Sequence, residues 1–205
     1  MKTQVGRLIV IEGPDGVGKT RIVHDLVNVL KTNSQHIVSL SFPGREPGTL
    51  GSLVYSLHHK LEAFGLNTIT PAALQTLHIA AHLDTIETRI KPLLNQGTTV
   101  VLDRFWWSTL VYGTVAGIER STLEHLIAAE NSVWYPHIPK CLILLDRQSS
   151  LRPEPSRDWE KLKAAYARLA KEEQTSFPVH RVCNDGEPTE TLDNICQILA
   201  EDLAN

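Results

Sequence analysis

The stretch IEGPDGVGKT, residues 11–20, contains the residue types best suited to binding phosphate. Its glycines, lysine and threonine complete the G-x-x-x-x-G-K-[ST] pattern, in which backbone N–H groups surround phosphate oxygens. The lysine of this pattern reaches the β- and γ-phosphates of a nucleoside triphosphate, and the hydroxyl can ligate Mg²⁺. We therefore predict a triphosphate-binding loop made of Gly13, Pro14, Asp15, Gly16, Val17, Gly18, Lys19 and Thr20. The alternative is a chance glycine-rich turn between a strand and a helix.

Asp103 and Arg104 are a second pair with suitable chemistry, at the end of the apolar run TTVVL. A carboxylate beside a phosphate loop suits water-mediated Mg²⁺ binding, and the planar fork of arginine binds the oxygens of an acceptor phosphate. A surface ion pair is the alternative. The chain lacks the N-K-x-D motif of GTPase switches. It also lacks the Asp-Glu pair that motor ATPases carry after the corresponding strand. These features favour a kinase.

Strand-like and helix-like patterns alternate along the whole chain. Strands are predicted at residues 5–13, 36–42, 97–103, 139–146 and 177–184. Helices are predicted at residues 19–31, 50–61, 71–94, 106–115, 121–133, 158–173 and 189–203. Five buried strands separated by helices predict an α/β fold: the three-layer P-loop NTPase fold with a five-stranded parallel sheet flanked by helices. The segment RQSSLRPEPSR, residues 147–157, has no apolar period and is predicted to be a mobile basic loop.

Composition limits the remaining possibilities. The chain has 205 residues, of which 42% are hydrophobic, so we expect one domain over residues 1–205. A net charge of −3 gives no reason to expect a nucleic-acid polymer or an acidic membrane as partner. The first strand-like segment carries Glu12, which a signal peptide would not. Three widely spaced cysteines are expected to be reduced thiols, which favours a cytoplasmic protein.

The order of the motifs resembles the thymidylate kinase family of nucleoside monophosphate kinases. FPGREPGTLG is similar to the family's F-P and R-E-P-G-G-T segments, and YPHIPKCLILLD to its fourth strand. LHIAAHLDTIETRIKPLLNQGTTVVLDRFWWSTLVYG resembles its long helix, I-x-P-x-L-x-x-G turn and D-R-Y segment. AAYARLAKE falls where the family has the helix after its lid. The resemblance implies ATP-dependent phosphorylation of a deoxynucleoside monophosphate, dTMP to dTDP, with Mg²⁺ and a homodimer.

The resemblance also implies roles for individual residues. Lys19 and the loop amides would hold ATP, with Mg²⁺ near Thr20 and Asp103, partly through water. Transfer then depends on positioning and charge neutralisation, and the acceptor phosphate, already ionised, needs no general base.

The acceptor nucleotide would contact a further set of residues. Arg104 and Arg45 would grip its phosphate, and Asp15 would lie near the sugar 3′ hydroxyl. Tyr112 would lie under the sugar, where it would crowd a 2′ hydroxyl and so favour deoxynucleotides. Phe42 would form a wall beside the base.

The lid, about residues 147–157, is expected to supply a cation for the transition state. One branch of the family has an arginine inside the phosphate loop, where this chain has Gly16. The cation is therefore expected from Arg147, Arg152 or Arg157, at least one of which is expected to be a solvated surface charge.

The base-reading positions depart from the family. His78 and His82 stand where an aromatic residue and an arginine commonly stack on and read the base. Their spacing places both on one helix face, where histidine can stack and donate a hydrogen bond. Alternatively, they are ordinary helix histidines and the base is read elsewhere. The acceptor could then be another pyrimidine or modified nucleotide, or a nucleoside with Glu12 as general base. A non-catalytic nucleotide-binding module is the second alternative.

Overall fold

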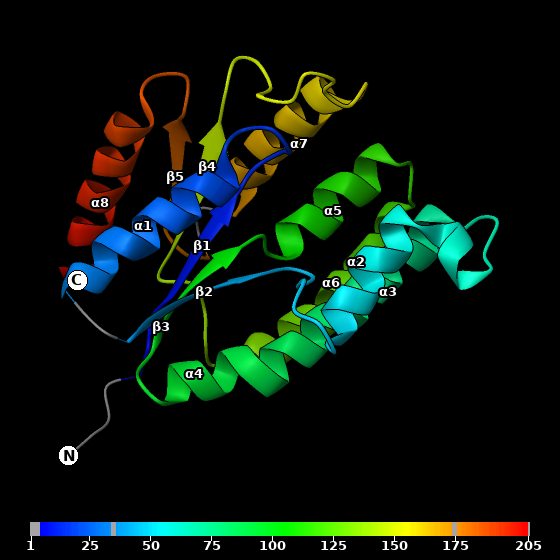
Figure 1. Cartoon of the computed structure of the whole chain (residues 1–205), viewed down its shortest axis with the longest axis horizontal. Coiled ribbons are helices and arrows are strands. Elements are labelled where there is room, and N and C mark those ends of the chain that lie inside the picture. The colour runs from blue at the N-terminus through cyan, green and yellow to red at the C-terminus, as the bar shows by residue number, and fades with distance from the viewer. Residues whose placement is uncertain (1–4, 34–35, 174–175, 205) are drawn as a thin grey trace.

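The computed structural model describes residues 5–33, 36–173 and 176–204 (Figure 1). Five parallel strands form one sheet in the order β2-β3-β1-β4-β5. The strands are β1 (Leu8–Glu12), β2 (Ile37–Ser41), β3 (Thr99–Asp103), β4 (Cys141–Asp146) and β5 (Val179–Cys183). The predicted α/β fold with a five-stranded parallel sheet is confirmed.

The helices lie close to the predicted ranges. They are α1 (Lys19–Asn33), α2 (Leu50–His59), the 3₁₀ turn η1 (Leu61–Phe64), α3 (Pro71–Thr85), the π-helical segment η2 (Ile86–Ile90), α4 (Lys91–Asn95), α5 (Trp106–Val115), α6 (Arg120–Trp134), α7 (Trp159–Glu172) and α8 (Pro188–Ala204). The helix predicted over residues 71–94 is thus three consecutive segments with a π-helical middle. Apolar spacing alone does not distinguish such a π-helical segment from an α-helix.

Two apolar cores lie on opposite faces of the sheet. Along β1, Leu8 and Val10 join one core and Ile9 and Ile11 join the other, because successive side chains of a strand point to opposite faces. Helices α1 and α8 cover the Ile9 face, while α5, α6 and most of α7 cover the other (Figure 1). Burial on both faces explains why the central strands β1, β3 and β4 appear in the sequence as nearly continuous apolar runs, whereas the outer strands β2 and β5 are only partly buried.

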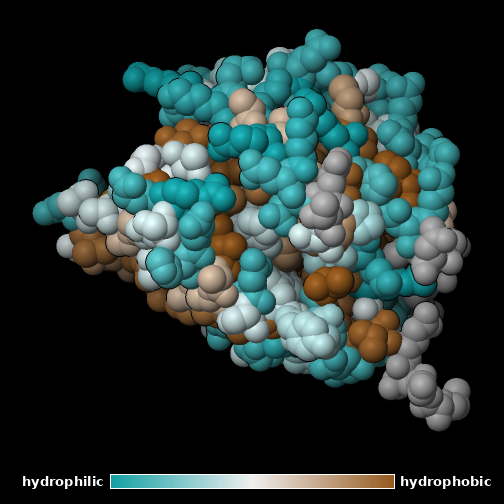
Figure 2. Space-filling view, turned by 180° about the vertical axis from the view of Figure 1, so that it is seen from behind, coloured by the Kyte–Doolittle hydropathy of each residue, from teal (hydrophilic) through white to brown (hydrophobic). Residues whose placement is uncertain are grey.

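On the side seen in Figure 2, hydrophilic residues dominate the surface and hydrophobic ones are interspersed among them. Within the described ranges, none of the helices is long and apolar enough to cross a bilayer.

The sheet places the predicted site residues at one edge. The carboxyl ends of parallel strands meet there, so the loops after β1, β2, β3 and β4 lie near one another. The loops after β1 and β3 contribute the phosphate loop and Arg104, and Phe42 directly follows β2.

Candidate active site

The loop after β1 has the backbone of a phosphate cradle. Gly16 and Gly18 have φ of +87° and +95°, a left-handed conformation that favours glycine. Asn184 supports the loop from outside, because its side-chain amide donates to Val17 O at 2.7 Å. A Cβ on Gly18 would lie 2.5 Å from that amide nitrogen, so this position requires glycine for space as well as conformation.

Lys19 begins α1 and folds back over the loop. Its ammonium group donates to Gly13 O at 2.7 Å and to Pro14 O at 2.9 Å, and only 6% of the residue is exposed. Burial, together with the nearby positive charge of Arg104, lowers the pKa of Lys19 to about 8. A bound phosphate chain would supply the negative charge that this buried ammonium lacks.

Arg104 lies at the centre of the site. It has φ of +76°, an unusual conformation for a residue with a side chain, and its guanidinium donates to Ser108 Oγ at 3.0 Å and forms an ion pair with Asp15. Although burial of Asp15 opposes its ionisation, Arg104 and Lys19 hold the pKa of this carboxyl below its ordinary value. Tyr112 contacts both of these residues. Its hydroxyl accepts from Asp15 N at 3.2 Å, and its ring centroid lies 5.5 Å from the Arg104 guanidinium carbon.

Glu12 is sealed beneath the loop and does not line the cavity beside Arg104. Its carboxylate accepts from Phe105 N at 2.7 Å, Ser108 N at 3.1 Å and the Tyr166 hydroxyl at 2.9 Å. Burial raises the pKa of Glu12, against the charges of Arg104 and Lys19. A carboxylate so enclosed is out of reach of an acceptor hydroxyl in the cavity.

Asp103 and Thr20 line the same cavity at its phosphate-loop end. Asp103 Oδ1 is buried and has no hydrogen-bond partner in the described part of the chain. An orphaned carboxylate oxygen and a threonine hydroxyl that line one cavity are a donor set that suits a hard divalent cation. The residues present therefore fit Mg²⁺.

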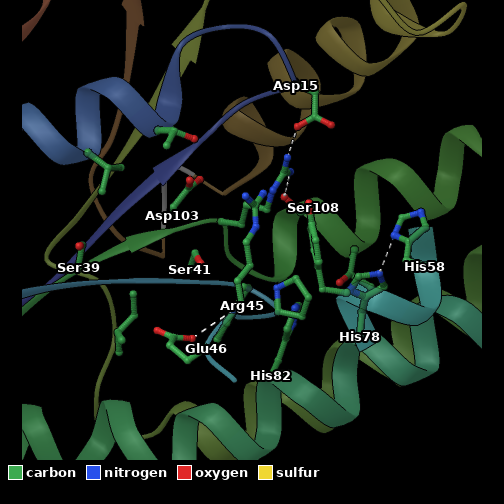
Figure 3. Close-up of a pocket in the computed structure, with 18 of the residues that line it drawn as sticks. Asp15, Ser39, Ser41, Arg45, Glu46, His58, His78, His82, Asp103 and Ser108 are labelled. Atoms are coloured by element: carbon green, nitrogen blue, oxygen red, sulfur yellow. Dashed lines mark hydrogen bonds and ion pairs between the residues drawn. The ribbon is translucent and has the colours of Figure 1, made fainter. Parts of the chain in front are cut away.

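A cavity of about 610 Å³ extends from this end toward α2 and α3 (Figure 3). The predicted acceptor residues that line it are Asp15, Phe42, Arg45, His78, His82, Arg104 and Tyr112. Arg45 lies over the Tyr55 ring at 4.5 Å, and Figure 3 shows its side chain among the pocket residues. The structure thus brings all seven of these residues to one cavity.

The two histidines differ in their surroundings. His82 is 3% exposed and stacks on Phe42, with ring centroids 4.0 Å apart and an interplanar angle of 12°. One face of Phe42 is therefore covered by His82, so a base could meet only the remainder of that side chain. His78 Nε2 lies 3.3 Å from His58 Nδ1. Burial and the neighbouring histidines lower the pKa of His78 to about 3, which leaves it uncharged at neutral pH.

The three candidate lid arginines point to different places. Arg152 forms an ion pair with Asp15 at 3.2 Å and lines the cavity. Arg147 instead donates to the backbone oxygen of Asn184, and Arg157 is exposed and does not line the cavity. The lid also contacts the phosphate loop directly, because Leu151 N donates to Gly16 O at 2.8 Å.

Several residues of the site were not identified from the sequence. Ser108 orients Arg104, Asn184 supports the phosphate loop, and the Trp159 indole donates to Asp15 O at 2.8 Å. Glu130 bonds to His82 from another helix. The position of Ser108, four residues after Arg104 at the start of a helix, is a signal that could have suggested its role. The others are distant in sequence from the residues they hold.

The sequence profile of a family described as thymidylate kinase matches residues 11–183. A thymidylate kinase of Chlorobium chlorochromatii is 35% identical over 162 residues, which cover 78% of this chain and 65% of that protein. A thymidylate kinase of Chlamydia trachomatis is 33% identical over 184 residues, covering 87% of this chain and 81% of that protein.

The matched region spans 65% of the length of the relatives from Chlorobium chlorochromatii and Chlorobium luteolum. Among solved structures, the crystal structure of thymidylate kinase from Ehrlichia chaffeensis superposes with a TM-score of 0.75. It covers 95% of this chain and 99% of its own, at 22% identity, and so supports the fold.

Proposed function

The chain belongs to the thymidylate kinase family, and from that premise we propose that it transfers the γ-phosphate of ATP to dTMP, giving ADP and dTDP. One observation carries the proposal: a single cavity is lined both by residues of the phosphate loop and by the residues that we assign to the acceptor. Thr20 and Asp103 line its donor end, and Phe42 and His82 line the other. Arg104 lines it as well, in reach of both Asp15 and Ser108.

The donor end would bind ATP through the loop amides and Lys19. Gly13, Gly16 and Gly18 allow these amides to turn inward, and the start of α1 adds positive potential. Thr20 and Asp103 would hold Mg²⁺, which the orphaned Asp103 Oδ1 supports. An ion held by these two residues would supply positive charge that neutralises the phosphates.

The acceptor end would bind dTMP by its phosphate and its sugar. Arg104 and Arg45 are the cations lining this part of the cavity that we assign to the phosphate, and Asp15 and Tyr112 lie together where the sugar would rest. His78 and His82 would meet the base.

Phosphoryl transfer at such a site depends on positioning and charge. The acceptor phosphate is ionised at neutral pH, so none of the chain's carboxylates has to remove a proton. The enclosure of Glu12 agrees with this, because the nucleoside-kinase alternative needs a base and Glu12 is not at the cavity surface.

Of the three lid arginines, Arg152 is the one we assign to the transition state. It already lies against Asp15, close to the phosphate loop, whereas Arg147 is engaged with Asn184. The lid of about residues 147–157 would act as part of one kinase domain over residues 1–205. Gly16 permits its approach, because a Cβ there would lie 2.1 Å from Ser150 Oγ.

Two further parts of the proposal concern the protein's setting. The three described cysteines, Cys141, Cys183 and Cys196, form no disulfide among themselves, which favours a reducing, cytoplasmic location. A homodimer is proposed on the family resemblance alone, and nucleotides are the proposed small-molecule partners.

The test is ADP release with a panel of nucleosides and mononucleotides in the presence of ATP and Mg²⁺. We expect dTMP to give the highest kcat/KM, and Lys19→Ala to abolish turnover with every acceptor. A higher kcat/KM for a nucleoside, or full activity of Lys19→Ala, would refute the assignment.

A further inference from the structure

A closed cluster of side chains lies at the far end of the cavity, between α3, α6 and the segment after β2. His82 Nδ1 lies 2.8 Å from Glu130 Oε2, and the Trp134 indole donates to Glu130 Oε1 at 3.2 Å. Phe42 stacks on His82 and lies 6.1 Å from Trp134 between ring centroids. We call Phe42, His82, Glu130 and Trp134 the His82 cluster.

Burial makes the charge balance of this cluster important. Glu130 is 0% exposed and His82 is 3% exposed. A carboxylate removed from water requires hydrogen-bond donors and a compensating cation. Trp134 supplies an uncharged donor, and His82 is the ionisable side chain bonded to Glu130 within the described ranges. The 2.8 Å contact between two enclosed side chains is the geometry of a histidine–carboxylate ion pair, in which His82 would balance the charge of Glu130.

The cluster also fixes how His82 is oriented. Its Nδ1 is directed at Glu130 Oε2, and the parallel stacking on Phe42 sets the plane of the ring. Nε2 makes no hydrogen bond to any described residue, while Figure 3 shows the side chain projecting from α3 into the pocket. Because a protonated imidazole donates at both nitrogens, Nε2–H is left as a donor for a ligand.

The neighbouring histidine cannot serve in the same way. His78 is uncharged at neutral pH. The hydrogen between its Nε2 and His58 Nδ1 can belong to either ring, so His78 can adopt either tautomer. The ring of His78 can therefore face either a donor or an acceptor on the ligand. The ring of His82, by contrast, has its Nδ1 held by Glu130.

We propose that Glu130 is a positioning residue for acceptor specificity, which holds His82 as a hydrogen-bond donor that selects a base with an oxo group over one with an amino group. This rests on the proposed function, in which the oxo group is that of thymine. Glu130 lies on α6, 48 residues from His82, and acts on the base only through that ring.

The test compares dTMP with 5-methyl-dCMP, which presents an amino group where thymine has the oxo group. Glu130→Met removes the partner of His82. We expect the ratio of kcat/KM for dTMP to that for 5-methyl-dCMP to fall about ten-fold, because a neutral His82 with no partner at Nδ1 can donate to an oxo group or accept from an amino group. The KM for ATP should stay unchanged.

Glu130→Gln is the conservative variant. The Trp134 indole can only donate, so the glutamine oxygen must face it and the NH₂ group must face His82 Nδ1. His82 then becomes neutral but keeps hydrogen on Nε2, so the ratio should fall by less, about three-fold. An unchanged ratio in this variant would overturn the proposal even if Glu130→Met fails to fold.

Repeating Glu130→Met in a His82→Phe background distinguishes an effect of Glu130 through His82 from a purely structural effect of Glu130. Phenylalanine retains the stacking on Phe42, and the double variant leaves no unpaired carboxylate. We expect Glu130→Met to leave the ratio unchanged in this background. An equal fall with and without His82 would show that Glu130 does not act through that ring.

Nitrogen NMR of histidine-labelled wild-type protein tests the proposal without activity. Both ring nitrogens of His82 should be protonated at neutral pH, and Glu130→Gln should remove one of the two protons. An unprotonated Nε2 in the wild type would overturn the proposal. Failure of dTMP as substrate, with both nitrogens protonated, would instead refute the proposed function alone.

Discussion

In the proposed mechanism, the charge of Lys19 changes with pH near neutrality. Its pKa of about 8 is below the ordinary value because the side chain is buried beside Arg104. Below that pKa the ammonium is charged and can bind phosphate; above it the charge is lost. ATP binding should therefore weaken as pH rises through about 8.

The measurement is the Kd of a non-hydrolysable ATP analogue from about pH 7 to about pH 9, and affinity should fall by at most about ten-fold per unit above the pKa. Lys19→Arg is the control, because a guanidinium stays charged throughout this range. Parallel curves for the two proteins would show that Lys19 does not titrate here.

Arg152 gives a second prediction for a single residue. Arg152→Ala should lower kcat about a hundred- to a thousand-fold, as loss of a transition-state charge does, with a smaller effect on KM. Arg157→Ala is a matched control from the same loop, since its side chain is exposed and outside the cavity. Equal effects of the two substitutions on single-turnover rates would contradict the assignment.

The contact between the lid and the phosphate loop depends on a glycine, Gly16, at the point where the two segments meet. Gly16 has φ of +87°, and a Cβ there would lie 2.1 Å from Ser150 Oγ. Gly16→Ala should lower kcat by displacing the lid, and should cost about 1–2 kcal/mol of unfolding free energy through its backbone.

Gly117→Ala is the control for this substitution. Gly117 has φ of +79°, with no atom within 4 Å of a built Cβ, and it does not line the cavity. It should show the same loss of unfolding free energy with kcat unchanged. If both variants retain kcat, lid docking on Gly16 is not required for turnover.

The elements themselves could largely be predicted from the sequence, because the central strands are buried on both faces and the phosphate loop has a complete motif. The predicted residues Arg104, Asp15 and Tyr112 do meet. The bond between His82 and Glu130 could not be predicted, since Phe42, His82 and the Glu130–Trp134 pair of α6 lie on separate elements that only tertiary packing brings together. For the same reason nothing in residues 147–157 showed which arginine faces Asp15.

For the whole molecule, Glu12 connects β1 to α5 and α7 beneath the site. It accepts hydrogen bonds from Phe105 N, Ser108 N and Tyr166. In Glu12→Gln the NH₂ group must face one of these donors, which should lower the unfolding free energy by about 2–4 kcal/mol.

Urea unfolding measures this change, and Glu62→Gln is the control because Glu62 is exposed. A Glu12→Gln protein as stable as the wild type would show that the buried network contributes little to the fold.

In the proposed reaction, one cavity holds ATP and dTMP together for direct transfer. Incubation with ATP radiolabelled at the γ-phosphate, followed by chromatography of the products, shows where the phosphate goes. We predict that the label appears in dTDP, at its terminal phosphate, when dTMP is present. Label that passes only to inorganic phosphate, or to the monophosphate of an added deoxynucleoside, would contradict the account.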